Sequence, residues 1–167
     1  MVGFQNMEPR GHRQRTAVMF NPILPARADN DYRGHKVALV LFGLLLVLKT
    51  GISLGSIFNG YAAATSADGI PLDSYTPNAA RTVLSLFALL GLANFVICVV
   101  GVVVLVRYRS LIAFMFALML VYQVGRYMIL LALPIVRTGT PPGSAINLTI
   151  LGMMIVGFAL SLWRQRE

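Results

Sequence analysis

Residues 37–58 read VALVLFGLLLVLKTGISLGSIF, an apolar stretch in which Lys49 is the only charged residue. A helix of about 20 apolar residues is long enough to cross a hydrocarbon core about 30 Å thick. This stretch therefore predicts a membrane-spanning helix, and Lys49 is an exception within it that needs its own explanation.

Three further apolar stretches of similar length follow along the chain, at residues 82–106, 111–133 and 146–163. The connection at 107–110 is so short that the helices on either side of it must form a hairpin. Glycine and proline interrupt the two longer connections, 59–80 and 134–145. The pattern predicts an all-α membrane protein, an antiparallel four-transmembrane-helix bundle.

The composition also indicates a membrane protein. Of the 167 residues, 57% are hydrophobic and only 12% are charged, whereas soluble domains carry about 25% charged residues. The formal net charge of +8 raises the question of a nucleic-acid surface. However, the basic residues lie at the ends of the apolar stretches, without the interleaved aromatic side chains that such a surface needs. We therefore expect no nucleic-acid partner.

The basic residues predict the orientation of the chain, because cytoplasmic loops carry an excess of Lys and Arg. With the N-terminus inside, only Arg81 and Arg137 fall on the outer side. The inner side then holds Arg10, Arg13, Arg15, Arg27, Arg33, Lys36, Arg107, Arg109, Arg164 and Arg166. We expect residues 1–36 to form a flexible, basic cytoplasmic region and 164–167 a cytoplasmic tail, with a bacterial cytoplasmic (inner) membrane as the location.

Two cations lie inside the predicted spans. At 1.5 Å per residue, Lys49 lies roughly 18 Å along the first helix and Arg126 roughly 22 Å along the third, so both fall in the outer half of the membrane. A charge near the middle of a bilayer costs about 2.5–3.5 kcal/mol on insertion scales, and such residues usually face the helix bundle. No span supplies a carboxylate, which leaves Asp68 and Asp73 in the 59–80 connection as possible counter-charges.

Two neutral polar residues are expected in the same layer, Asn94 on the second span and Gln123 on the third. Together with Lys49 and Arg126, they are our predicted ligand-binding residues for an anionic group or a lipid headgroup. Two other interpretations stay open. The cations can extend toward the outer interface along their long side chains, or they can pair with a partner subunit.

Glycines predict where helices approach one another closely. Helical periodicity places Gly91 and Gly101 on the face of the second span that also carries Asn94. Gly51 and Gly55 form a GxxxG pair that points away from Lys49, which indicates a second contact surface. We expect all four glycines to serve helix packing.

Reactive groups are sparse in this sequence. Cys98 is the single cysteine, so an intrachain disulfide is impossible, and His12 and His35 lie apart from other metal-binding side chains. No span offers a carboxylate pair, a histidine base or a nucleophile with its partner. We therefore predict no metal, no cofactor and no enzymatic activity.

An accessory or structural subunit of a larger membrane complex fits a small four-helix chain with short loops and a spare GxxxG surface. The expected partners are membrane lipids, together with other membrane-protein subunits or further copies of the same chain. The alternative function is a small oligomeric transporter or channel for an anionic solute, in which several copies surround a pathway.

Overall fold

The computed structural model describes residues 23–25 and 27–163, and within these residues every regular element is helical. Four helices are long and apolar enough to cross a membrane, which supports an integral multi-pass membrane protein. They are α2 (Lys36–Phe58), α4 (Pro77–Arg107), α5 (Ile112–Ala132) with the short helix η3 (Arg109–Leu111) before it, and α6 (Pro142–Leu162). A helix is thus present at each of the four predicted positions.

Two helices begin earlier than the sequence predicts, and proline explains both differences. The Thr76 side chain caps α4 by accepting from the backbone N–H of Ala79 at 3.4 Å, and Pro77 occupies the first turn. The α6 helix begins at Pro142, inside the 134–145 connection, which is therefore shorter than predicted. Proline is tolerated in a first turn because its missing N–H would have no partner inside the helix there.

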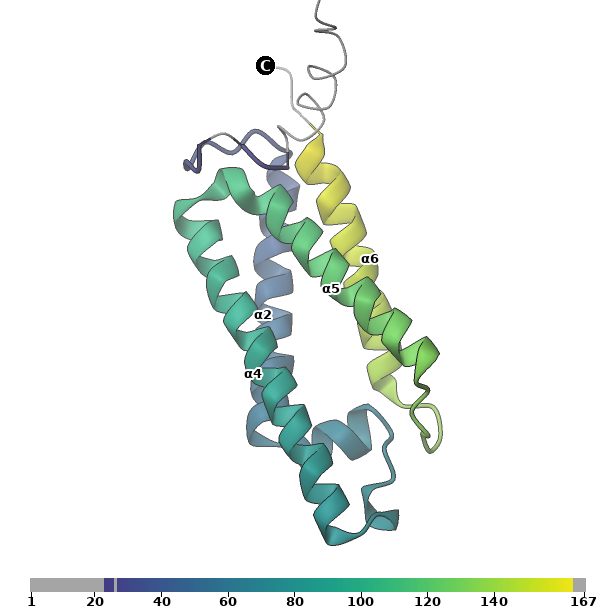
Figure 1. Ribbon diagram of the computed structural model, residues 1–167. Helices are drawn as coiled ribbons and strands as arrows, with labels where there is room; N and C mark the ends of the chain where they lie inside the picture. The colour runs from purple at the N-terminus through teal and green to yellow at the C-terminus, as the bar shows by residue number, and fades with distance from the viewer. Residues whose placement is uncertain (1–22, 26, 164–167) are drawn as a thin grey trace, which may run out of the picture.

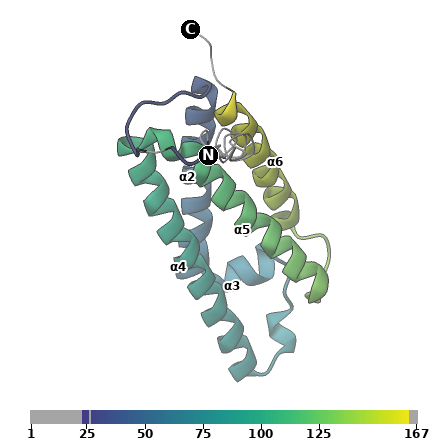
Figure 2. The same ribbon diagram turned by 45° about the horizontal axis from the view of Figure 1, so that its top comes forward.

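The α2 helix is central and packs most extensively against α4 and then against α6. The α5 helix packs mainly against α6 and only slightly against α4. In Figures 1 and 2, α4 lies along α2, whereas α5 diverges from α4. The buried core lies mainly among α2, α5 and α6, where the rings of Phe42 and Phe116 pack edge to face with their centroids 5.1 Å apart.

One end of the bundle brings together the segment before α2, the α4–α5 connection and the last turn of α6. The hydroxyl of Ser110 donates to the carbonyl of Asp29 at 2.9 Å, and the His35 N–H donates to the carbonyl of Leu160 at 3.2 Å. This part of the predicted N-terminal region therefore contacts the helices. Residues 1–22, 26 and the predicted tail at 164–167 lie outside the described part of the chain.

The opposite end carries residues 59–76, which we call the cap segment. It contains the single turns α3 (Gly60–Ala62), η1 (Ala63–Ala67) and η2 (Leu72–Ser74). Its buried residues Ala64, Ile70 and Leu72 form a small core against the first turns of α4. Its Gly69 has φ of 72°, and the carbonyl of Gly69 accepts from the backbone N–H of Thr138 at 2.8 Å. The cap segment is thereby joined to the connection that precedes α6.

Gly143 fixes the approach between the cap segment and α6. A Cβ atom at this position would lie 2.5 Å from the carbonyl oxygen of Ala67 and 2.9 Å from Oδ1 of Asp68. Only glycine leaves room for the chain to pass so closely. This close approach accompanies the placement of Asp68 near Arg126 on α5.

Candidate functional site

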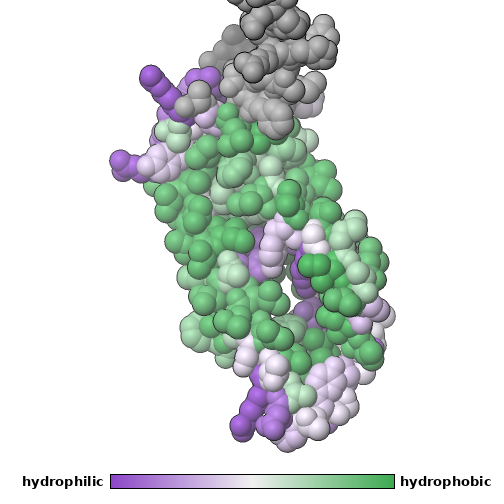
Figure 3. Space-filling model, viewed as in Figure 1, coloured by the Kyte–Doolittle hydropathy of each residue, from purple (hydrophilic) through white to green (hydrophobic). Residues whose placement is uncertain are grey.

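The divergence of α5 from α4 leaves a cavity of about 500 Å³ at the end of the bundle nearest the cap segment. This volume lies within the range of ligand pockets, about 300–1,000 Å³. Its polar lining includes Lys49, Asp68, Asn94, Gln123 and Arg126, from α2, the cap segment, α4 and α5. Figure 3 shows hydrophilic residues inside a hollow in the middle of a mainly hydrophobic face, with further hydrophilic residues at the two ends.

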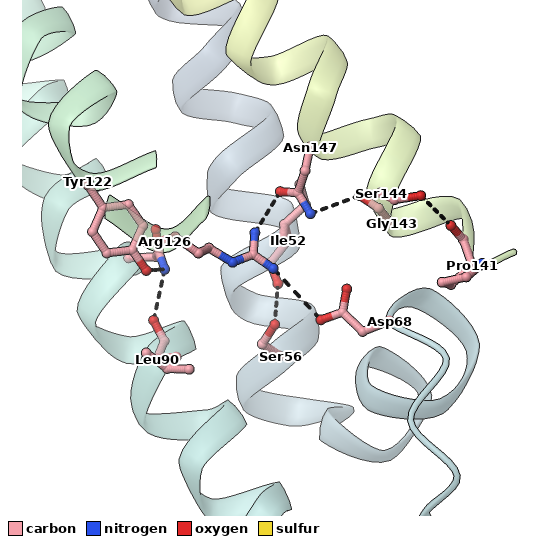
Figure 4. Close-up of polar contacts among 11 residues, drawn as sticks. Ile52, Ser56, Asp68, Leu90, Tyr122, Arg126, Pro141, Gly143, Ser144 and Asn147 are labelled. Atoms are coloured by element: carbon pink, nitrogen blue, oxygen red, sulfur yellow. Dashed lines mark hydrogen bonds and ion pairs between the residues drawn. The ribbon is translucent and has the colours of Figure 1, made fainter. Parts of the chain in front are cut away.

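The guanidinium of Arg126 is held by two other elements (Figure 4). Its Nη1 donates to Oδ1 of Asn147 on α6 at 2.9 Å, and its Nη2 lies 3.9 Å from Oδ2 of Asp68. Asn147 is oriented in turn, because its Nδ2 donates to the carbonyl of Gly143 at 2.8 Å. Arg126 therefore links α5 to α6 and to the cap segment.

The ammonium of Lys49 has a different environment. Its side chain is buried, with 9% of the residue exposed, and its Nζ lies 5.7 Å from the centroid of the Tyr122 ring. Among the described residues, no carboxylate lies within ion-pair distance of this ammonium. A cation over an aromatic face gains about 0.5–2 kcal/mol, which offsets only part of the cost of burying an unpaired charge.

The charges of the cavity do not balance. Lys49 and Arg126 contribute two cations, and Asp68 is the one carboxylate among the lining residues of the described chain. One net positive charge therefore remains in a site enclosed by apolar helices. Electrostatic interactions are stronger where water is scarce, so this charge imbalance is felt more strongly than it would be at an open surface.

Two amide side chains in the cavity are incompletely hydrogen-bonded. Asn94 Nδ2 donates to the carbonyl of Leu90 at 3.0 Å and to the hydroxyl of Tyr122 at 2.9 Å, while its Oδ1 has no partner. Gln123 is 1% exposed, and its Nε2 is buried without a partner. Leaving a buried polar group unsatisfied costs about 1–3 kcal/mol, so both groups have hydrogen-bonding capacity for a bound molecule.

Asp73, the second predicted counter-charge, lies away from the cavity. The hydroxyl of Tyr61 donates to its Oδ1 at 2.7 Å on the exposed side of the cap segment. This hydrogen bond and the negative charge of Asp73 raise the pKa of Tyr61 above its ordinary value. The structure thus brings Asp68 to Arg126 and leaves Asp73 in a separate contact.

The four glycines divide into two pairs. A Cβ at Gly91 would lie 2.9 Å from the Ser53 carbonyl oxygen, and one at Gly101 would lie 2.5 Å from Cδ2 of Leu46, so both lie where α4 meets α2 closely. Gly51 and Gly55 have no neighbouring atom within 4 Å of such a Cβ and are exposed. An added side chain at either position would therefore meet open space within the described chain.

Sequence reasoning missed two residues of the site, Tyr122 and Asn147. Tyr122 precedes Arg126 by four residues, so helical periodicity places the two on one face of α5, and that signal was available. Asn147 lies near the start of an apolar helix, and nothing in the sequence indicates that α6 brings it to Arg126.

Within residues 23–25 and 27–163, no group of three or more His, Cys, Asp or Glu side chains lies close enough to hold a metal ion. Comparisons with protein-family models, with curated proteins and with solved structures found no match to this chain.

Proposed function

We propose that this protein is a non-enzymatic multi-pass membrane protein that binds an anionic group, such as a lipid headgroup, in the cavity between α4 and α5. The observation that carries the proposal is the unbalanced charge of the cavity, where Asp68 approaches Arg126 but not Lys49. An anion beside Lys49 would supply the missing counter-charge. The four spans would form an antiparallel bundle around this site.

The wider role that we propose is that of an accessory or structural subunit of a larger membrane complex. The exposed Gly51 and Gly55 support this role, because a small-residue face on a membrane helix allows a second helix to approach closely. The distribution of Lys and Arg supports cytoplasmic termini, and with them the cap segment on the outer side of a bacterial cytoplasmic membrane.

A small oligomeric transporter or channel for an anionic solute is the alternative function. One observation favours it: Asp68, Arg126 and Asn147 also line a second cavity of about 50 Å³, which extends from the first one toward Arg137. An anion moving between the polar end of the bundle and the main cavity would meet cations on this route. Flux of an anionic solute into proteoliposomes that falls in both Lys49→Leu and Arg126→Leu would support it, and unchanged flux would exclude it.

Native mass spectrometry of the protein extracted in a mild detergent tests anion binding directly. The probes are phosphatidylglycerol and phosphatidylcholine, which differ in headgroup charge. We expect the natural protein to retain phosphatidylglycerol preferentially and Lys49→Met to lose that preference. Arg81→Gln is the matched control, because Arg81 is an exposed basic residue outside the cavity. Equal retention of both lipids by the natural protein would refute the proposal.

A further inference from the structure

The cavity contains two kinds of unfilled polar group, and together they restrict the ligand more narrowly than charge alone. A ligand beside the ammonium of Lys49 must carry a negative charge. Two buried amide atoms also lack a partner: Oδ1 of Asn94, which can only accept a hydrogen bond, and Nε2 of Gln123, which can only donate one. From this combination we infer that the ligand is a lipid phosphodiester with free hydroxyl groups on its headgroup, an inference that rests on the proposed function.

The orientation of the Asn94 amide makes the hydroxyl requirement specific. The carbonyl of Leu90 can only accept a hydrogen bond, so Nδ2 of Asn94 must face it. Oδ1 is consequently the atom without a partner, and it can only accept. The ligand must therefore bring a donor to Asn94. An ammonium group would be repelled by Lys49 and Arg126, which leaves a hydroxyl.

Gln123 on α5 adds a hydrogen-bond donor to the lining of the cavity. Its Nε2 is buried without a partner among the described residues, and only 1% of the residue is exposed. A phosphate oxygen or a headgroup hydroxyl can accept from this N–H. Only the hydroxyl can also donate to Oδ1 of Asn94.

The charge of the ligand follows from the charge of the site. Lys49, Arg126 and Asp68 leave one net positive charge, which a single negative charge neutralises. A phosphodiester carries one negative charge at neutral pH. A phosphomonoester carries about 1.5 to 2 and would leave the enclosed site with excess negative charge.

The surroundings of the opening favour a lipid over a soluble phosphodiester. Three strongly exposed apolar residues border the cavity, Leu90 on α4 with Val121 and Ile129 on α5. In a membrane these side chains would lie among acyl chains. A lipid could thus place its headgroup inside while its chains leave between α4 and α5, where the hollow in Figure 3 opens to the side.

The test compares four probes in one competition assay on the full chain in nanodiscs or mild detergent. They are phosphatidylglycerol, a phosphatidyl methyl ester of the same charge without hydroxyls, phosphatidylcholine, and deacylated glycerophosphoglycerol. We expect phosphatidylglycerol to bind roughly three- to tenfold more tightly than the methyl ester, the factor that one or two neutral hydrogen bonds supply. Asn94→Leu should remove this difference and retain the preference for both anionic lipids over phosphatidylcholine.

Asn78→Leu is the matched control, because Asn78 is an exposed asparagine on α4 outside the cavity, and it should leave all affinities unchanged. Gln123→Met should weaken the binding of phosphatidylglycerol and of the methyl ester alike, because Nε2 of Gln123 can donate to a phosphate oxygen of either lipid. Equal affinity for phosphatidylglycerol and the methyl ester would overturn the inference and leave the proposed function standing. If neither anionic lipid binds more tightly than phosphatidylcholine, the inference and the proposed function are both overturned. Tight binding of the deacylated probe would show that the chains are not recognised and would reject a lipid ligand.

Discussion

Arg126 and Asn147 join α5 to α6 through a hydrogen bond of 2.9 Å inside the membrane-spanning part of the bundle. With Asp68 near its other terminal nitrogen, the Arg126 guanidinium already has partners within the chain. Lys49 has only the ring of Tyr122. The two cations therefore differ in their surroundings, since Arg126 has polar partners from two other elements and Lys49 has no carboxylate partner among the described residues.

Lys49→Met tests this difference through stability. Without an anionic ligand, methionine should be more stable at this buried site, because it removes an unpaired charge that costs about 2.5–3.5 kcal/mol on insertion scales. We expect the apparent Tm in a neutral detergent to rise by roughly 2–4 °C for each kcal/mol gained. Added phosphatidylglycerol should stabilise the natural protein and not the variant. A variant that is less stable in neutral detergent and equally stabilised by the lipid would contradict the assignment of Lys49.

Asp68→Asn should change the charge preference of the cavity. The substitution removes the one carboxylate of the site and leaves two cations, while the asparagine keeps a similar shape. The negative charge of Asp68 repels an anion in the cavity. At an effective dielectric constant of about 20, removing this repulsion at a distance of several ångströms is sufficient for roughly a tenfold increase in affinity for an anion. We expect the gain to be larger for phosphatidic acid, a phosphomonoester, than for phosphatidylglycerol.

The matched control for this prediction is Asp73→Asn, which removes a carboxylate from the cap segment outside the cavity. It should leave both lipid affinities unchanged in the same mass-spectrometric competition. An equal gain in Asp68→Asn and Asp73→Asn would mean that net charge of the protein, rather than the cavity, controls binding.

Glycine substitutions separate the contacts inside the chain from the free face of α2. In Gly91→Ala the added methyl group meets the Ser53 carbonyl oxygen at 2.9 Å, so backbone must move, and we expect a loss of about 1–3 kcal/mol. Gly51→Ala fills open space and should be neutral or slightly stabilising, because alanine favours the helix. Thermal unfolding of both variants in one detergent measures the difference. Comparable losses would show that α2 uses both faces within the chain.

The contact between Tyr61 and Asp73 predicts a pH dependence in the cap segment. Because the pKa of Tyr61 is raised, this contact contributes stability that is complete below the ordinary pKa of tyrosine, about 10, and is lost as the pH rises through the value in the folded protein. Phenolate absorbance, taken as the difference from Tyr61→Phe, follows this titration. Asp73→Asn should lower the Tyr61 pKa toward its ordinary value, whereas Asp31→Asn should leave it unchanged.

The sequence predicted the helices well because their signal is local. Lipid-spanning length and apolar composition are properties of continuous stretches, so all four helices were found within a few residues of their ends. The sequence analysis placed Lys49, Asn94, Gln123 and Arg126 in one polar layer within the spans, and all four line one cavity.

What the sequence could not predict depends on contacts between distant segments. Asp68 and Asp73 lie in the same predicted connection, and the sequence does not show which of them approaches Arg126. The close contact between the cap segment and Gly143 places Asp68 there. Asn147 reaches Arg126 because α5 lies against α6, which no local pattern indicates. Gly51 and Gly55 resemble a packing pair, yet no helix of the described chain approaches within 4 Å of a Cβ built at either position.

The distance between Nζ of Lys49 and a lipid phosphorus atom tests most directly whether an anionic lipid headgroup lies beside Lys49. The chain contains only two lysines, so Lys36→Arg leaves Lys49 as the single lysine ammonium. Solid-state NMR of ¹⁵Nζ-labelled protein in phosphatidylglycerol bilayers then reports how close this nitrogen lies to lipid ³¹P. A direct ammonium–phosphate contact, with N–O distances of about 2.8 Å, predicts strong ¹⁵N–³¹P dephasing that disappears when phosphatidylglycerol is replaced by phosphatidylcholine. Absence of dephasing in phosphatidylglycerol, or equal dephasing in both lipids, would contradict the account.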